Sequence, residues 1–302
     1  VDGKTYADQV ASKKIFHMLS FDGTRPVWDK PLMDEYDRIR QSGETFSCPH
    51  YPHSAEDILL ACKTFANTIK GGEWAVWSSI SPWVEATLLQ FGVKEVTTVD
   101  YNEPKVVGVP QLKTFGQAGI AKAYADGKIG FDGIVSFSGL EHDGLGRYGD
   151  PVNPFGDFSA MREIWLCLKP GGLLLLAVPT AAQGNIQFPF HRIYGPERVR
   201  PLIECYEMIG RVWDGKSVEG GLEKSNVDPP LFVTLSSLND TGTIFDARLG
   251  KKLESWQHQH VLVLRKPFNA GSECPLNVRG AWSSSPVESY ETNNMKGNKR
   301  QR

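Results

Sequence analysis

Several features that mark particular classes of protein are missing from this sequence. No stretch approaches the roughly 18 apolar residues needed to cross a bilayer, so no membrane span is expected in this chain. The five cysteines form no Cys-x-x-Cys pair and are too few for a disulfide scaffold, and their odd number leaves at least one without an intrachain partner. Lys and Arg number 33 against 35 Asp and Glu, which gives a net charge of −2, so no nucleic-acid partner is expected.

The sequence does contain enough apolar residues for a core, and its strand and helix patterns alternate. Hydrophobic residues make up 40% of the chain and charged residues 23%, as in folded domains. Strands are expected at 73–78, 95–99, 131–137, 173–178 and 260–264, and helices at 55–69, 81–91, 158–168 and 197–209. This alternation predicts an α/β fold with helices on both faces of a doubly wound, mostly parallel, Rossmann-like sheet.

The α/β pattern occupies 71–268 and divides the chain into three parts. Residues 1–70 predict an N-terminal helical extension that packs on the core, with Ser54 as the cap of its last helix. Gly, Ser, Asn and Pro dominate 269–302, which predicts a flexible tail. The chain opens with Val1 rather than Met, so we expect a trimmed or processed sequence that could lack an anchor. The compartment stays open between cytoplasm and secretory-pathway lumen, as does the oligomeric state.

The first candidate site joins a turn to an acid. A strand leads through Ser78, Ser79, Ile80 and Ser81 into a helix whose start leaves backbone N–H groups free for an anion or carboxylate. Asp100 ends the next strand, where a carboxylate can accept hydrogen bonds from both ribose hydroxyls. The turn has no glycine, which hinders close approach of a dinucleotide pyrophosphate and favours S-adenosylmethionine over NAD. The alternative is a plain strand–helix–strand unit in which Asp100 caps a turn.

A second candidate site follows the strand at 131–137. Glu141 and His142 come directly after that strand and are expected at the same carboxyl edge of the sheet. His142 could take a proton from a hydroxyl nucleophile, and Glu141 could orient that base or bind substrate. Glu141 and Asp143 could also hold a divalent metal, although no EF-hand spacing exists. A solvated acidic loop is the alternative.

Two further segments are candidates for binding the substrate. The loop at 144–157 is rich in Gly and Pro yet carries Arg147, Tyr148 and Asp157, a composition typical of ordered binding loops. Arg147 and Tyr148 could contact a sugar or a carboxylate acceptor. Further on, His191 is a second candidate base and Arg192 could clamp the acceptor, with a surface His-Arg pair as the alternative.

The order of these motifs resembles that of class I S-adenosylmethionine-dependent methyltransferases. The ordered set is a strand ending in Asp100, a strand that begins Phe-Asp at 131–132, Leu-Glu-His at 140–142, and Leu-Lys-Pro-Gly-Gly at 168–172 before a hydrophobic strand. The resemblance implies a methyltransferase-like domain that binds S-adenosylmethionine through the turn at 78–81 and Asp100. It places Tyr101, Ser138 and Gly139 beside that cofactor.

A narrower resemblance rests on longer segments. The stretches at 81–86 (Ser-Pro-Trp-Val-Glu-Ala), 99–101, 138–150, 154–157 and 191–195 resemble a nematode-type family defined by domain of unknown function 268. The resemblance covers about 65–215. That family is methyltransferase-like, but it supplies no acceptor.

Two functions from different classes follow. The first is methyl transfer from S-adenosylmethionine to a hydroxyl of a small molecule, a sugar or a glycan, with His142 as base, Glu141 as its aid and His191 in reserve. The second is a binding or scaffold module in a larger assembly that has lost the cofactor, which the glycine-poor turn favours. A nicotinamide-dependent oxidoreductase is disfavoured because phosphate-binding glycines are missing.

Overall fold

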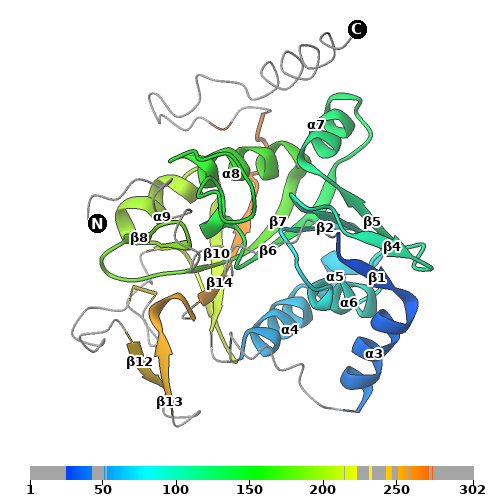
Figure 1. Ribbon diagram of the computed structural model, residues 1–302, viewed down its shortest axis with the longest axis horizontal. Helices are drawn as coiled ribbons and strands as arrows, with labels where there is room; N and C mark the ends of the chain where they lie inside the picture. The colour runs from blue at the N-terminus through cyan, green and yellow to red at the C-terminus, as the bar shows by residue number, and fades with distance from the viewer. Residues whose placement is uncertain are drawn as a thin grey trace, which may run out of the picture.

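The chain forms a central eight-stranded sheet with helices on both of its faces (Figure 1). This computed structural model describes residues 25–42, 51, 53–213, 215–222, 231–232, 243–246, 251–257, 259–271 and 274. Much of the predicted N-terminal extension (1–24, 43–50 and 52) and of the predicted tail (272–273 and 275–302) therefore lies outside the described residues.

The helices and strands follow the predicted alternation through most of the described chain. The helices are α3 (Lys30–Gln41), α4 (Ser54–Thr64), α5 (Ala66–Ile69), α6 (Trp83–Gln90), α7 (Gln117–Ala125), α8 (Gly156–Cys167) and α9 (Pro196–Ile203), with the short 3-10 turns η1 (Leu140–His142) and η4 (Ser255–Gln257). The large sheet contains β2 (Glu73–Trp77), β3 (Glu95–Val99), β5 (Leu112–Phe115), β6 (Phe131–Phe137), β7 (Leu168–Pro179), β10 (Glu207–Trp213), β11 (Lys216–Glu219) and β14 (Gln259–Arg265). Three strand pairs lie apart from it: β1 (Val27–Asp29) with β4 (Lys105–Val107), β8 (Asn185–Gln187) with β9 (His191–Ile193), and β12 (Thr243–Asp246) with β13 (Lys251–Glu254).

The strand order of the large sheet is β11-β10-β14-β7-β6-β2-β3-β5. The pairs from β7 to β5 are parallel, whereas β14 runs antiparallel to both β7 and β10. The predicted doubly wound, mostly parallel sheet is therefore confirmed. Because β2 has β3 on one side and β6 on the other, the strand order reverses direction beside β2. In such sheets a ligand binds beyond the carboxyl ends of the strands at this reversal.

Buried strands supply apolar side chains alternately to the two helical layers. Leu174 and Leu176 of β7 pack with Ile164 of α8 in one core, whereas Leu173 and Leu175 pack with Ile58 of α4 in the other. Burial on both faces explains the continuous apolar run of this strand. The shared second core also shows that α4, from the segment before residue 71, packs directly on the sheet.

Some expected element boundaries were wrong. The predicted helix at 197–209 ends at Ile203, and β10 then adds to the sheet as an antiparallel partner of β14. Tertiary pairing with β14 overrides the helical spacing of the apolar residues there. The expected cap Ser54 is instead the first residue of α4, whose N-cap residue is His53, and Pro82 is the N-cap residue of α6.

One pair of cysteines forms a bond. Cys205, just after α9, is joined to Cys274 by a disulfide, whereas the buried Cys62 and Cys167 form no disulfide among the described residues. Cys48 lies outside the described residues. Within the described residues, no helix has the length and apolar character needed to cross a membrane.

Candidate functional site

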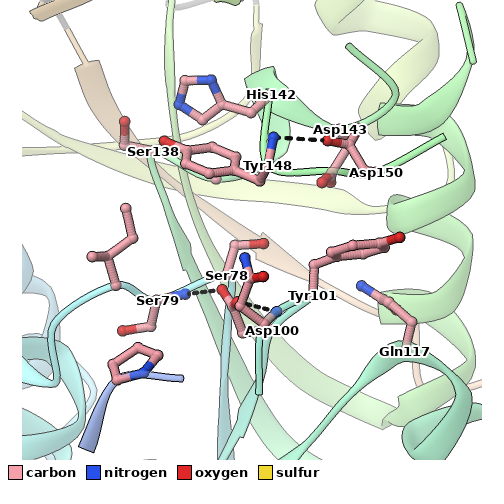
Figure 2. A pocket seen from close by; sticks show the side chains of 14 residues that line it. Ser78, Ser79, Asp100, Tyr101, Gln117, Ser138, His142, Asp143, Tyr148 and Asp150 are labelled. Carbon is pink, nitrogen blue, oxygen red and sulfur yellow. Dashed lines mark hydrogen bonds between the residues drawn. The ribbon is translucent and has the colours of Figure 1, made fainter. Parts of the chain in front are cut away.

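A cavity opens at the carboxyl ends of β2, β3 and β6, beside the reversal of strand order (Figure 2). The space between its walls and at its mouth, open solvent included, amounts to about 660 Å³. Much of its wall comes from the turns that follow these three strands and from the loop after η1. The lining residues are Pro26, Ser78, Ser79, Ile80, Asp100, Tyr101, Asn102, Gln117, Ser138, Gly139, His142, Asp143, Tyr148 and Asp150. The structure thus brings together all but one of the residues expected to bind the cofactor, Ser81 being absent from this lining, and adds His142 and Tyr148.

Asp100 clasps the turn after β2 to the turn after β3. Its Oδ2 accepts a hydrogen bond from the backbone N–H of Ser79 at 3.0 Å, and its Oδ1 accepts one from the N–H of Asn102 at 2.8 Å. Burial raises the pKa of Asp100, against the lowering effect of these two bonds. Each carboxylate oxygen retains a second lone pair, so Asp100 can still accept hydrogen bonds from a ligand.

The turn without glycine takes a backbone shape that glycine usually supplies. Ser78 has φ of 65° and Ser138, at the corresponding end of β6, has φ of 48°. Non-glycine residues in this left-handed region are strained and are concentrated at functional sites. A glycine is instead required in the neighbouring turn, after β6. A Cβ atom on Gly139 would lie less than 3.0 Å from the Cβ atom of Ser78. The two turns can therefore pack against each other only when one of them lacks a side chain.

His142 is held in one tautomer. Its Nδ1 lies 2.5 Å from the carbonyl oxygen of Phe190, a contact that requires an N–H at Nδ1 and leaves the lone pair at Nε2. Burial lowers the pKa of His142 to about 3, and the charge of Arg147, whose Nη1 lies 3.5 Å from Nδ1, accounts for part of this shift. The imidazole is therefore neutral at physiological pH and can accept a hydrogen bond at Nε2.

Glu141 lies behind the cavity wall at the centre of a buried polar network. Its Oε1 accepts hydrogen bonds from Ser138 Oγ at 2.6 Å and from Gln259 Nε2 at 3.3 Å, and lies 3.7 Å from His142 Nε2. The hydroxyl of Tyr51 contacts Ser138 Oγ on its other side. Burial raises the pKa of Glu141 to about 7, so this carboxyl exchanges its proton near neutral pH. Sequence reasoning missed Tyr51 and Gln259, which no local motif marks.

The loop after η1 is fastened by a carboxylate. Asp150 accepts backbone hydrogen bonds from Gly144 at 2.8 Å, Gly146 at 3.1 Å and Tyr148 at 3.2 Å. This arrangement holds the ring of Tyr148 edge-on to His142, with 5.4 Å between ring centroids. Arg147 lies over the same tyrosine ring and donates to the carbonyl of Phe190.

Two residues expected to contact substrate support the loop from beneath instead. Asp157 is fully buried and accepts a two-bond ion pair from Arg198, at 2.7 and 2.8 Å. Arg192 is also fully buried and donates to the backbone carbonyls of Asp143 at 2.6 Å and Asn153 at 3.4 Å. Neither side chain lines the cavity, so the expectation that they touch substrate does not fit these positions. Both side chains stabilise the conformation of the loop that follows η1.

His191 lies near the site but outside the cavity wall. Its ring centroid is 6.4 Å from that of His142, and only 8% of the residue is exposed. Burial lowers its pKa to about 4, with a further contribution from the charge of Arg147. Ile80 and Tyr101, by contrast, are exposed cavity residues, at 62% and 44%.

The cavity is acidic. Asp100, Asp143 and Asp150 line it, and none of its lining residues in the described part of the chain is Lys or Arg. Burial raises the pKa of Asp143 well above its usual range, and the neighbouring Asp150 carboxylate adds to that rise. Such a wall suits hydroxyl donors and cations and disfavours phosphate groups. Among the described residues, no three His, Cys, Asp or Glu side chains converge as a metal site would require.

Comparison with known protein families identifies the family of this chain. A family model described as Caenorhabditis protein of unknown function, DUF268, matches residues 72–228, just over half of the chain. The chain belongs to this family. The matched region contains β2, β3, β6 and the loop after η1, and hence nearly the whole cavity. The family resemblance expected from the sequence is thereby confirmed. No curated protein sequence matches the chain.

Solved structures with a similar course of the chain include two methyltransferases and a cyclase. The 1,6-didemethyltoxoflavin-N1-methyltransferase of Burkholderia thailandensis, crystallised with S-adenosylhomocysteine, has 13% identity and a TM-score of 0.40, over 78% of this chain and 87% of that one. The N-methyltransferase NodS of Bradyrhizobium japonicum has 12% identity and a TM-score of 0.40, over 84% and 97%. The [4+2]-cyclase SpnF has 11% identity and a TM-score of 0.43, over 81% and 98%. Values this low say nothing about the reaction of this chain.

Proposed function

We propose that this protein is an S-adenosylmethionine-dependent methyltransferase that acts on a hydroxyl group of a sugar or glycan. The observation that carries the proposal is the cavity at the reversal of strand order, which has Asp100 at the end of β3 and no Lys or Arg among the described residues of its wall. A nicotinamide dinucleotide would bring two phosphates to an acidic wall. S-adenosylmethionine brings a ribose, an ammonium and a sulfonium, each of which an acidic wall favours.

The residues of the cavity fit that cofactor. Asp100 would accept hydrogen bonds from the ribose hydroxyls, and the turn at 78–81 would hold the methionine end. Tyr101, Ser138 and Gly139 would border the cofactor from the neighbouring turns. When bound, S-adenosylmethionine supplies a methyl group activated on a sulfonium, and the protein's part is to align the acceptor oxygen with that methyl.

His142 and Glu141 would remove the acceptor's proton. The Phe190 carbonyl fixes the N–H of His142 at Nδ1, which leaves Nε2 to accept a hydrogen bond from the acceptor hydroxyl. Arg147 opposes a lasting positive charge on this ring, whereas Glu141, 3.7 Å away, can hold a proton near neutral pH. The proton would therefore come to rest on Glu141.

A hydroxyl-rich acceptor suits the open side of the cavity. Tyr101 and Tyr148 offer aromatic rings, and the carboxyl groups of Asp143 and Asp150 line the same cavity. Aromatic faces next to carboxylates can bind the apolar faces and the hydroxyls of a sugar together.

The test is calorimetric titration with S-adenosylmethionine and S-adenosylhomocysteine, with NAD as the control ligand. Micromolar binding that is lost in Asp100→Ala and kept in Asp34→Ala, an exposed carboxylate on α3, would support the proposal. Absence of binding to a folded sample would favour the alternative, a scaffold module without cofactor. Transfer of a labelled methyl group to a panel of glycans, with amines for comparison, then tests the acceptor.

A further inference from the structure

Glu85 is a buried acid to which neither the motifs nor the proposed reaction assigns a role. It lies in the first turn of α6, directly after the turn at 78–81, and is 0% exposed. Its Oε1 accepts a hydrogen bond from Thr98 Oγ1 at 2.8 Å. Its Oε2 is buried without a hydrogen-bond partner among the described residues. An apolar residue would fill this position without leaving a polar atom unsatisfied, so the carboxyl needs an explanation.

The neighbours of Glu85 are the parts of the proposed cofactor site. Thr98 lies on β3, two residues before Asp100, and Ser79 donates its backbone N–H to Asp100. Ser79 Oγ donates to the carbonyl of Ser81 within the turn, and both this hydroxyl and the Asp100 charge influence the pKa of Glu85. Glu85 therefore supports, from behind, both turns that Asp100 clasps together.

Glu85 is hydrogen-bonded to β3 two residues before Asp100, and two carboxyls at one strand end do not readily carry two charges. Burial raises the pKa of Glu85 to about 7, and the neighbouring Asp100 charge contributes to that rise. The acids on other elements packed against α6 are engaged elsewhere. Asp37 of α3 bonds Gln90 at the far end of the helix, Glu73 of β2 pairs with Lys94, and Asp57 of α4 accepts the N–H of Gly215.

We propose that Glu85 is a positioning residue which, as a neutral acid, keeps the turn at 78–81 in shape and leaves the negative charge to Asp100. This inference rests on the proposed function, since it concerns binding at the same turn. When Glu85 ionises, its charge faces that of Asp100 across Ser79, and the clasp between the two turns weakens. Ligand affinity then falls as the pH rises through neutrality.

The experiment is titration calorimetry of the full chain with S-adenosylhomocysteine at pH 6, 7, 8 and 9. We expect the affinity of the unmodified protein to fall about tenfold from pH 6 to pH 9. Glu85→Gln, which imitates the neutral acid, should match the unmodified protein at pH 6 and change less than about threefold up to pH 9. Thr98→Val, which removes the hydroxyl that orients Oε1, should weaken binding at pH 6.

Glu163→Gln is the matched control, because Glu163 on α8 is another acid whose pKa burial raises to about 7. It should keep the pH dependence of the unmodified protein. An equal pH dependence in Glu85→Gln would overturn the inference while leaving the proposed function standing. Failure of the unmodified protein to bind at any pH would overturn both. Thermal unfolding of each ligand-free variant at pH 6 and 9 shows whether a loss of binding reflects a loss of fold.

Discussion

A Cβ atom on Gly139 would come within 3.0 Å of the Cβ of Ser78, so the turns after β6 and β2 meet at a point where only one side chain fits. Ser78 adopts φ of 65° and keeps its side chain at this contact, whereas the opposing residue, Gly139, has none. The pair fixes how closely two walls of the cavity approach each other. The shape of the cavity therefore depends on Gly139, which follows β6, and not on a glycine in the turn at 78–81.

Adding a methyl group at this contact should disturb both stability and binding. Gly139→Ala should destabilise the protein by about 1–3 kcal/mol, the usual result of overpacking, and weaken S-adenosylhomocysteine binding. Ser78→Gly should be nearly neutral, because relief of the left-handed strain offsets the added freedom of the unfolded chain. The double variant should recover part of the loss, which urea unfolding of all four proteins measures. Additive losses would show that the two residues do not interact.

The pair of Asp157 and Arg198 should matter for stability and little for binding. Asp157→Asn breaks a two-bond ion pair whose carboxylate is fully buried and leaves Arg192 nearby without a counter-charge, so a loss of about 3 kcal/mol in urea unfolding is expected. The control is Glu207→Gln, which breaks a similar pair with Arg265 at the surface and should cost less than about 1 kcal/mol. A stable Asp157→Asn protein with weakened acceptor binding would restore the original expectation of a substrate contact.

His142 should be required for turnover but not for binding of the cofactor. His142→Gln should bind S-adenosylhomocysteine within about threefold of the unmodified protein and lose at least 100-fold in methyl transfer to a glycan identified in the panel. Because the pKa of His142 is lowered to about 3, its protonation cannot cause a loss of rate between pH 8 and pH 6. Any such loss belongs to Glu141, whose carboxylate must be ionised to receive the proton, and should vanish in Glu141→Gln. Turnover that persists in His142→Gln would move the base to His191.

The sequence was sufficient to predict the parallel strands β2, β3, β6 and β7, though not β5, and the edge of the sheet at which the cavity lies. Strands such as β3 and β7 carry continuous apolar or β-branched runs, and the acid or imidazole that follows such a strand must lie at its carboxyl end. Local pattern therefore placed Asp100 and His142 near one another without knowledge of the contacts between them.

The parts that could not be predicted depend on contacts between distant segments. Gln259 reaches Glu141 from β14, and the Phe190 carbonyl that fixes His142 belongs to the turn between β8 and β9. Asp157 was misjudged for the same reason, since only the fold reveals Arg198 as its partner. The local sequence around a charged residue in a Gly-rich loop does not show whether its side chain faces a cavity or pairs with an arginine.

The free energy of unfolding should fall as the pH rises through neutrality, because several acidic side chains are buried where their charged forms are poorly stabilised. Burial raises the pKa of Glu85, Glu141 and Glu163 to about 7, so the folded state holds these protons at a pH where the unfolded chain has released them. Their contribution is fully present below about pH 4.5 and is lost by the time the pH passes about 7.

Urea unfolding at pH 5 and pH 8 should therefore show a lower free energy of unfolding at pH 8. Glu141→Gln should reduce that difference by on the order of 1–3 kcal/mol, since each unit of pKa shift is worth about 1.4 kcal/mol. Glu207→Gln, which removes an exposed carboxyl, should leave the difference unchanged. A difference that Glu141→Gln leaves unchanged would mean that water or a neighbouring group compensates this buried carboxylate, and Glu141 would then lose its role as the residue that holds the acceptor's proton.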